Sequence, residues 1–425
     1  MAQSARALLD TPVAVAVDGR GNIAIADYGN HRVRMVAARS GTFYGRPMKA
    51  GDIYTIAGNG LYWFSGDGGP ALRAEFGYPN VNSLLDVATN RHGDLLISDS
   101  GNGRLRLMPA SDAVLFGRRL LAGHVYSLAG RKRLTFVFGS DYGCPGTESL
   151  AADGLAPCWV GYDGSGNAVV SSANEIKVVA AHSGTYYGRP MTAGHVYVIA
   201  GGGARTTDGA LATEAKLAPF GLAIDGHGNI LTGSGGRIRV VAAAQGTFYG
   251  TAMKAGRVYS IGTGTSVEAI DHHGNAVITS GNMVRVIAAR DGIFYGQPMT
   301  TGHVYTVAGN GDPNFSSDGG PATAAGMSPA DVAVDPAGNL LISDGQFQNQ
   351  YTDRLRVVAV HSGTFYGVAM TAEHIYTVAG AGMSLGEGVP ALAAQFPGPV
   401  SIAVLPDGGV IAADAQSRRI RLIHN

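Results

Sequence analysis

The chain has few cysteines, no excess of charge of either sign and no long apolar run. Its 425 residues include 31 basic and 31 acidic side chains, and no block of like charges stands out. Because nucleic acids and anionic membranes attract clustered Lys and Arg, we expect neither as the main partner. No segment has eighteen consecutive apolar residues, so we expect no membrane span.

The two cysteines, Cys144 and Cys158, lie in one long connecting segment, whose insertion we place at residues 130–157. A disulfide between them would fit an oxidising compartment, and two reduced thiols are the alternative. The N-terminus has no charged region followed by an apolar one, so it is not an intact signal peptide. We expect an extracytoplasmic or secreted protein whose signal peptide is not in this sequence, with a cytoplasmic location as the alternative.

Glycine is abundant, at 64 residues, but it does not recur at every third position, which excludes collagen. Many short strands joined by tight turns would use glycine in this way.

A repeat of about sixty residues runs through the chain. Each copy starts with a short apolar run that ends in a polar turn containing glycine, which is typical of a hairpin. The seven copies of this run are "VAVAVDGRGN" from Val13, "LLDVATNRHGD" from Leu84, "CWVGYDGSGN" from Cys158, "FGLAIDGHGN" from Phe220, "SVEAIDHHGN" from Ser266, "ADVAVDPAGN" from Ala330 and "VSIAVLPDGG" from Val400.

Three further strands are predicted in each copy, as in "IAIAD", "HRVRMVAA" and "IYTIAG" of the first repeat. The fourth occurs six times and the others seven times, so the last repeat lacks its outer strand. We expect the N-terminal residues 5–9 to supply it and to close a ring. The sequence therefore predicts one all-β domain over residues 1–425, a seven-bladed β-propeller of four-stranded antiparallel blades. A six-bladed ring with one stray module is the alternative.

The stretch "VAVDGRGNIAIADYGNHRVRMV" resembles the NHL repeat family, whose pattern includes the Asn30, His31 and Arg32 seen here. The resemblance recurs once per blade and implies a propeller fold. It implies no single function, because such propellers act as enzymes, sensors and binding platforms. The third, fourth and fifth repeats lack the aspartate that stands at Asp27, so a role for that residue in every blade is not implied.

A long connection between the third and fourth strands, "SGTFYGRPMKAG", recurs in six repeats with one drifted copy. Its repetition indicates an architectural role, with the aromatic pair Phe43 and Tyr44 packed on the blade edge. Stacking on carbohydrate is the alternative.

Strand direction decides which loops share a face. Loops from the second to the third strand lie with those that lead to the next blade, and this face carries the irregular insertions. Loops that interrupt a rigid repeat are where binding residues are expected. From them we take as candidate contacts Tyr62, Trp63, Arg131, Phe347 and Tyr351.

The innermost strands carry three unexpected carboxylates, Asp86, Glu268 and Asp331, and Trp159 stands at the equivalent place in the third repeat. Buried carboxylates are costly unless they are paired or bound to a cation. The three could hold a divalent cation such as calcium at the channel mouth with Trp159 as an apolar wall, or could be solvated by channel water. Asp67 and Asp318, in "SGDGGPA" and its copy, could instead ligate calcium or belong to a structural turn before a short helix.

Most histidines occupy repeat positions, and no known catalytic motif appears in a fitting context. Our first hypothesis is a monomer that binds a small molecule or a protein over the central channel. The second is a metal-assisted lyase or hydrolase with its site at the channel mouth.

Overall fold

The computed structural model describes residues 7–77, 86–130, 158–316, 318–345, 353–384 and 388–424. Within these ranges the regular structure is β-strand, with a few 3-10 helices of three residues each. None of the helices in the described part is long and apolar enough to cross a membrane. The fold is therefore all-β, as the sequence predicts.

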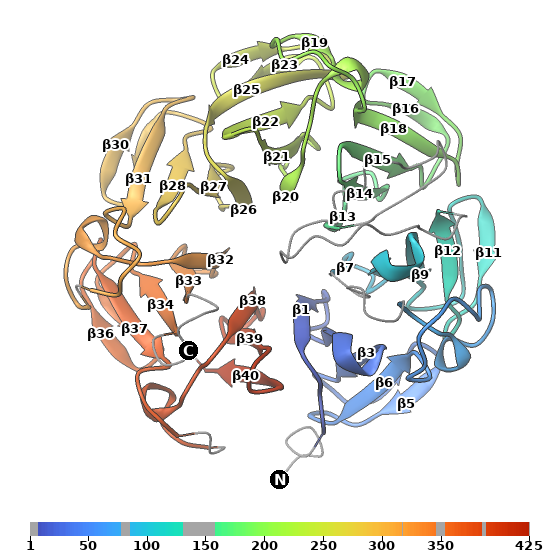
Figure 1. Ribbon diagram of the computed structural model, residues 1–425, viewed down its shortest axis with the longest axis horizontal. Coiled ribbons are helices and arrows are strands. Elements are labelled where there is room, and N and C mark those ends of the chain that lie inside the picture. The colour runs from blue at the N-terminus through green and yellow to red at the C-terminus, as the bar shows by residue number, and fades with distance from the viewer. Residues whose placement is uncertain are drawn as a thin grey trace.

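The strands form antiparallel sheets set radially around one axis (Figure 1). In each repeat they are ordered first, second, third and fourth from the axis outward. The first strands are β1 (Pro12–Val17), β7 (Val87–Thr89), β13 (Val160–Tyr162), β20 (Phe220–Ile224), β26 (Ser266–Ile270), β32 (Pro329–Val334) and β38 (Pro399–Val404). The second strands are β2 (Ile23–Asp27), β8 (Leu95–Asp99), β14 (Ala168–Ser172), β21 (Ile230–Ser234), β27 (Ala276–Thr279), β33 (Leu340–Asp344) and β39 (Val410–Asp414).

The outer strands follow the same pattern. The third strands are β3 (Arg32–Val36), β9 (Arg104–Met108), β15 (Glu175–Val179), β22 (Arg237–Val241), β28 (Val284–Ile287), β34 (Arg354–Val358) and β40 (Arg419–Ile423). The fourth strands are β6 (Ile53–Ala57), β12 (Tyr126–Ala129), β18 (Val196–Gly201), β25 (Arg257–Thr263), β31 (Val304–Ala308) and β37 (Ile375–Ala379). A parallel bridge between Gly221 and Val267 joins the sheets of the fourth and fifth repeats.

The "TFYG" connections form two-stranded hairpins between the third and fourth strands. They are β4–β5 (Gly41–Phe43, Arg46–Met48), β10–β11 (Ala113–Leu115, Arg118–Leu120), β16–β17 (Gly184–Tyr186, Arg189–Met191), β23–β24 (Gly246–Phe248, Thr251–Met253), β29–β30 (Gly292–Phe294, Gln297–Met299) and β35–β36 (Gly363–Phe365, Val368–Met370). The remaining elements are β19 (Ala210–Leu211) and the 3-10 helices η2 (Tyr28–Asn30), η3 (Ala71–Arg73), η4 (Ser100–Asn102), η5 (Ala212–Glu214), η6 (Ala322–Ala324) and η7 (Ala391–Ala393).

The core lies between neighbouring sheets. Second strands such as β2 and β8 are buried at every residue, because each is covered on both faces by the adjacent repeats. Such strands can be apolar throughout rather than alternating. The third and fourth repeats, for example, share one cluster in which Val169 and Ile176 pack with Ile230 and Val241.

An Asp-x-x-x-Asn turn follows five of the seven first strands as a buried hydrogen-bonded unit. In the first repeat, the Asp18 carboxylate accepts the backbone N–H of Arg20 and Asn22 and the side-chain amide of Asn22. Asn22 Oδ1 in turn accepts the N–H of Ala38 at 3.0 Å. The recurring aspartate therefore fixes the first hairpin.

A tyrosine of the hairpin loop ties neighbouring repeats together. The Tyr44 hydroxyl donates to the Gly93 carbonyl of the second repeat at 2.5 Å. Tyr187, Tyr249 and Tyr366 lie 3.2 Å from the equivalent carbonyls of Gly228, Gly274 and Gly408. These buried tyrosines confirm that the "TFYG" connection is architectural.

The first and last repeats lie in contact. Val15 and Ile25 pack with Ile411 and Ala413, and Arg418 Nε lies 3.4 Å from the Asp10 carboxylate. In the described part of the chain, however, the last sheet has three strands, and residues 7–9 add none to it. The predicted closing strand is thus not found there, and side-chain packing makes the contact instead.

Candidate functional site

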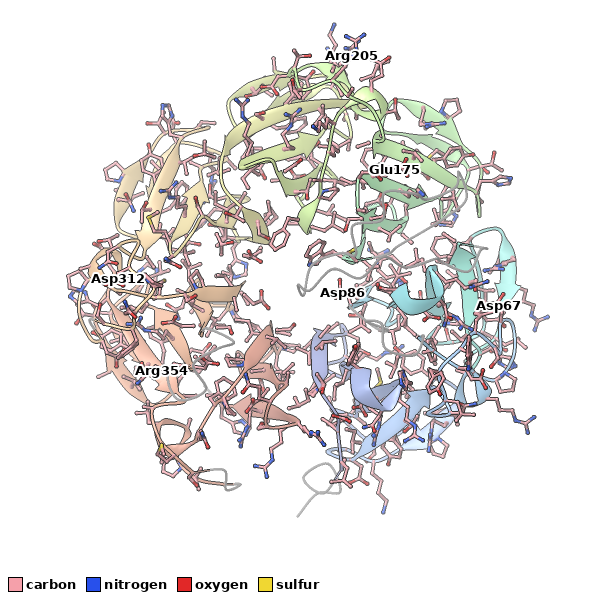
Figure 2. All side chains as sticks on the ribbon, viewed as in Figure 1. Asp67, Asp86, Glu175, Arg205, Asp312 and Arg354 are labelled. Atoms are coloured by element: carbon pink, nitrogen blue, oxygen red, sulfur yellow. The ribbon has the colours of Figure 1, made fainter. Side chains whose placement is uncertain are left out.

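Three carboxylates occupy the first strands or their starts, and we call them the channel carboxylates: Asp86, Glu268 and Asp331. Figure 2 shows Asp86 beside the central axis. The Asp86 carboxylate accepts the N–H of Val87 at 2.8 Å and that of Val160, in the next repeat, at 2.9 Å. Asp331 repeats this arrangement with the N–H groups of Val332 and Ile402, both at 2.8 Å. Each aspartate therefore links its own first strand to the following one.

Glu268 has a different environment. Its Oε1 accepts the hydroxyl of Thr279 at 2.8 Å within the same sheet. Among the described residues no Lys or Arg forms an ion pair with Glu268, Asp86 or Asp331.

The channel carboxylates share one electrostatic environment. Burial raises the pKa of Asp86 to about 7, although two backbone N–H groups oppose the shift, and the charge of Asp331 raises it further. Burial and the charge of Asp331 also raise the pKa of Glu268 to about 7. Burial raises the pKa of Asp331 to about 6. Near neutral pH these groups are therefore partly protonated.

The geometry gives no support to a preformed cation site here. No group of three or more His, Cys, Asp or Glu side chains in the described part of the chain is arranged to hold a metal ion. In both aspartates each carboxylate oxygen accepts one backbone N–H, so a cation would share these oxygens with the backbone.

Trp159 lies next to this site, as its position in the repeat predicts. Its neighbour Val160 binds Asp86, and its ring meets that of Phe220 edge to face with centroids 5.2 Å apart. Phe220, which sequence reasoning did not select, thus extends the apolar wall into the fourth repeat.

A second candidate site is the aromatic loop, which we define as residues 61–64 between β6 and β7. Its four side chains are large and all are exposed: Leu61 58 %, Tyr62 42 %, Trp63 43 % and Phe64 38 %. A contiguous exposed apolar surface of this kind marks an interaction site more often than chance exposure does.

The backbone of the aromatic loop is held in place. Trp63 donates its N–H to the Gly77 carbonyl and accepts the side-chain amide of Asn102 on its own carbonyl, both at 2.9 Å. Because Asn102 ends the second-to-third connection of the next repeat, the two types of loop share one face, as strand direction predicts. Trp63 has a φ of 121°, a value that a residue with a side chain rarely adopts.

An arginine and a histidine ring contact the side chains of the aromatic loop. The Arg104 guanidinium lies 3.5 Å from the centre of the Phe64 ring, and the Tyr62 ring contacts that of His31. Sequence reasoning selected Tyr62 and Trp63 but missed Phe64 and Arg104. The signal was the unbroken run "LYWF", whose last residue we left out.

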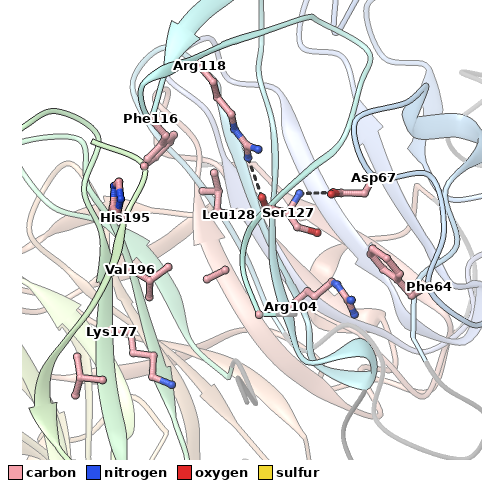
Figure 3. Close-up of a pocket in the computed structure, with 14 residues that line it drawn as sticks. Phe64, Asp67, Arg104, Phe116, Arg118, Ser127, Leu128, Lys177, His195 and Val196 are labelled. Carbon is pink, nitrogen blue, oxygen red and sulfur yellow. Dashed lines mark hydrogen bonds between the residues drawn. The ribbon is translucent and has the colours of Figure 1, made fainter. Parts of the chain in front are cut away.

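A cavity of about 1000 Å³ lies beside this loop, between β12 and β18 (Figure 3). Phe64 and Arg104 line one side, and Lys177 and His195 line the other. The cavity is at the outer part of the ring and does not include the channel carboxylates. The structure therefore separates the predicted contacts Tyr62 and Trp63 from the predicted cation ligands.

Several predictions fall on residues outside the described ranges. They are Arg131, Phe347, Tyr351 and Cys144, and they stay predictions. Cys158 is described and buried.

The carboxylates of Asp67 and Asp318 are bound by groups of neighbouring fourth strands. The Asp67 carboxylate accepts the N–H of Ser127 on β12, and that of Asp318 accepts the N–H and hydroxyl of Thr377 on β37 at 2.7 and 2.9 Å. Each segment then enters a short 3-10 helix, η3 or η6. The prediction of a structural turn before a short helix is confirmed.

The repeat pattern and the radial sheets can now be compared with known proteins. The family model of the NHL repeat matches residues 9–34. This stretch of the first repeat is therefore similar to an NHL repeat. These residues cover β1, β2 and the start of β3, together with the turn that ends in Asn30 and His31.

Solved structures share the fold at low sequence identity. A streptogramin B lyase structure has a TM-score of 0.52 and 9 % identity, covering 99 % of this chain and 97 % of its own. Catalytically inactive virginiamycin B lyase from Staphylococcus aureus, with quinupristin, has a TM-score of 0.51 and 8 % identity, covering 95 % and 92 %. The extracellular domain of a protein described as a hybrid two component system, from B. thetaiotaomicron, has a TM-score of 0.50 and 12 % identity, covering 100 % of this chain and 40 % of that one. A search of curated proteins found no match.

Proposed function

We propose that the chain forms a seven-bladed NHL-type propeller and binds a ligand or protein partner with the face that carries the aromatic loop. The contact between the first and last repeats supports a closed ring. A closed ring brings loops from distant repeats to one surface, which is the usual binding face of repeat architectures.

The observation that carries this proposal is the exposure of all four side chains of the aromatic loop on a fixed backbone. Exposed apolar side chains lower the solubility of a protein, so a fixed set of them indicates an interaction surface. Two hydrogen bonds hold the backbone of Trp63 at a φ that glycine adopts more readily than tryptophan. Rigid aromatic side chains bury a large area on binding and lose little conformational freedom. With Arg104 beneath Phe64, the loop suits an apolar or aromatic partner surface with some acidic character.

The test separates binding from folding. We expect Trp63→Gly to leave the free energy of unfolding unchanged or to raise it by about 1 kcal/mol, because glycine adopts this φ freely. The same change should remove most of the binding. A photo-crosslinking residue at Leu61 should capture a partner from extracytoplasmic extract, and the adduct should be lost in the Trp63→Gly background.

The matched control is a crosslinker at Leu211, which is also exposed but belongs to another connection. Identical adducts from the two positions, or adducts that survive Trp63→Gly, would count against the aromatic loop as the binding surface.

An extracytoplasmic location, a monomeric state and the disulfide between Cys144 and Cys158 complete the proposal. A mass two units lower before reduction than after it would support the disulfide, and free thiols in protein purified without reductant would contradict it.

The alternative is a metal-assisted lyase or hydrolase at the channel mouth. The supporting observation is that Asp86 and Glu268 have pKa values of about 7, so either can exchange a proton near neutral pH. Elemental analysis of purified protein would detect a bound divalent ion. If no metal is found and Glu268→Gln leaves a detected activity intact, the alternative is wrong.

A further inference from the structure

Three of the fourth strands do not end their sheets with a free edge. The segment that leaves the preceding repeat lies along each of them and pairs with its outward backbone groups. We call these the cap segments: residues 67–71 on β12, 208–212 on β25 and 318–322 on β37.

The three cap segments make the same contacts. In each, the aspartate carboxylate accepts a backbone N–H from the fourth strand. The donors are Ser127, Ser260 and Thr377. The glycine after the aspartate donates its N–H to the carbonyl of the residue two places before that donor, which is Val125, Val258 or Ile375. An alanine three places further donates to the strand's preceding turn, at Gly123, Gly256 or Glu373.

The strand β31 has no cap segment. The fourth repeat passes directly into the fifth through residues 264–265, all of which the structure describes, so no chain is left to cover this edge. No partner from the described residues pairs with the outward N–H and C=O of Val304 or with the N–H of Thr306. Val304 is only partly buried, whereas Val125, Val258 and Ile375 are each 0 % exposed.

The two residues that face the cap carboxylate nevertheless recur in the fifth repeat. In the fourth and sixth repeats the arginine opposite the capped residue lies near the cap aspartate: Arg239 is 3.8 Å from Asp208, and Arg356 is 3.7 Å from Asp318. The equivalent residue Arg285 pairs in register with Thr306. Its Nη2 contacts the Met283 sulfur at 3.6 Å, and no carboxylate among the described residues forms an ion pair with it.

We propose that the β31 edge binds an extended segment of another protein that carries aspartate followed by two small residues, as in Asp-Gly-Gly-Pro-Ala. The carboxylate would accept the Thr306 N–H and hydroxyl beside Arg285, and the following backbone would add to β31 as an extra strand. This surface lies at the rim of the ring, so the proposal does not depend on the aromatic loop.

The chain supplies its own probe. A fluorescein-labelled peptide with the sequence of residues 65–74, SGDGGPALRA, should bind the full-length protein in a fluorescence polarisation titration. Replacing the peptide aspartate by alanine should weaken binding about tenfold or more, because a charge-assisted hydrogen bond is lost.

Two protein variants locate the binding to β31. Thr306→Pro removes the outward N–H at an edge position where proline is tolerated, and Arg285→Met removes the cation. Each should weaken binding about tenfold or more. Thr306→Ser is the matched control, because it keeps both the N–H and the hydroxyl, and it should bind within about threefold of wild type. Circular dichroism and thermal unfolding of all three establish that they are folded.

Three results would overturn the proposal. Absence of binding at millimolar peptide would do so directly. Equal binding to wild type and Thr306→Pro would mean that the peptide binds the protein at a place other than the β31 edge. A wild-type dimer that dissociates in Thr306→Pro would show that a second copy of this chain, rather than a different protein, occupies the edge.

Discussion

Besides the aspartates of the hairpin turns, the protein buries carboxylates at two kinds of position that differ in how the charge is balanced. At the ends of four second strands, each is paired with an arginine of the third strand: Asp27 with Arg34 at 3.2 Å, Asp99 with Arg106 at 3.4 Å, Asp344 with Arg356 at 3.1 Å and Asp414 with Arg421 at 3.5 Å. Around the axis, the channel carboxylates have backbone N–H groups or a hydroxyl but no cation among the described residues.

The two kinds of position differ in the charge that lies next to the buried carboxylate. Asp99 is fully buried, so burial raises its pKa, while Arg106 and the N–H of Gly77 oppose that shift. Its carboxylate also holds Gly77, in the segment before the first strand of its own repeat. At the axis the charge of Asp331 adds to the effect of burial on Asp86 and Glu268. Arginine therefore opposes the effect of burial at Asp99, whereas at the axis a second carboxylate adds to it.

Removing an arginine that is paired with a buried aspartate should have the largest effect. Arg106→Met leaves Asp99 buried without its counter-charge, and we expect a loss of about 3–5 kcal/mol in the free energy of unfolding. Denaturant titration measures it. Adding Asp99→Asn in the same chain should recover part of the loss, and a single-variant loss below about 1 kcal/mol would mean that the pair is solvated.

The pH dependence should be the next largest effect. The channel carboxylates have raised pKa values in the folded state, so that state holds more protons than the unfolded chain between about pH 4 and pH 7. The free energy of unfolding should therefore fall as pH rises through this window. The contribution of these three groups to it is largest at the acidic end.

Asp331→Asn tests the origin of that slope. It removes the charge that raises the pKa of both Asp86 and Glu268, so the difference in melting temperature between pH 5 and pH 8 should shrink. An unchanged difference would assign the slope to the other buried aspartates. Calorimetry at both pH values gives the answer.

The smallest effect is expected at an arginine without a buried carboxylate partner. Arg239 occupies the position of Arg106, but the fourth repeat has Ser234 where Asp99 stands, and its nearest carboxylate, Asp208, is 46 % exposed. Arg239→Met should change the free energy of unfolding by less than about 1 kcal/mol, since it leaves no buried charge behind. A loss as large as that of Arg106→Met would remove the distinction between the two kinds of repeat.

Much of the fold could be predicted because each repeat has the same local sequence pattern. Alternation in "HRVRMVAA" and the glycine turns predicted strands such as β2 and β3 where the structure has them. The sequence pattern could not establish a closing strand at residues 5–9, because a short apolar stretch does not determine the strand with which it pairs. The structure instead uses Val15 and Ile411 for that contact.

The candidate site was less predictable, because it depends on contacts between repeats. Asp86 and Asp331 stood out as carboxylates on an inner strand, but nothing in the sequence indicated that Val160 and Ile402 would supply their hydrogen bonds. Asp67 was recognisable as part of a turn, while its pairing with Ser127, sixty positions away, was not.

The hydrogen bond from Tyr44 to Gly93 also bears on how such a chain can change in length. The donor sits in the hairpin of one unit and the acceptor in the first turn of the unit that follows, and the pattern is the same for Tyr187 and Gly228. A duplicated unit therefore arrives with a donor for its successor and an acceptor for its predecessor. Genes of this type can gain or lose a whole module without having to evolve a new joint.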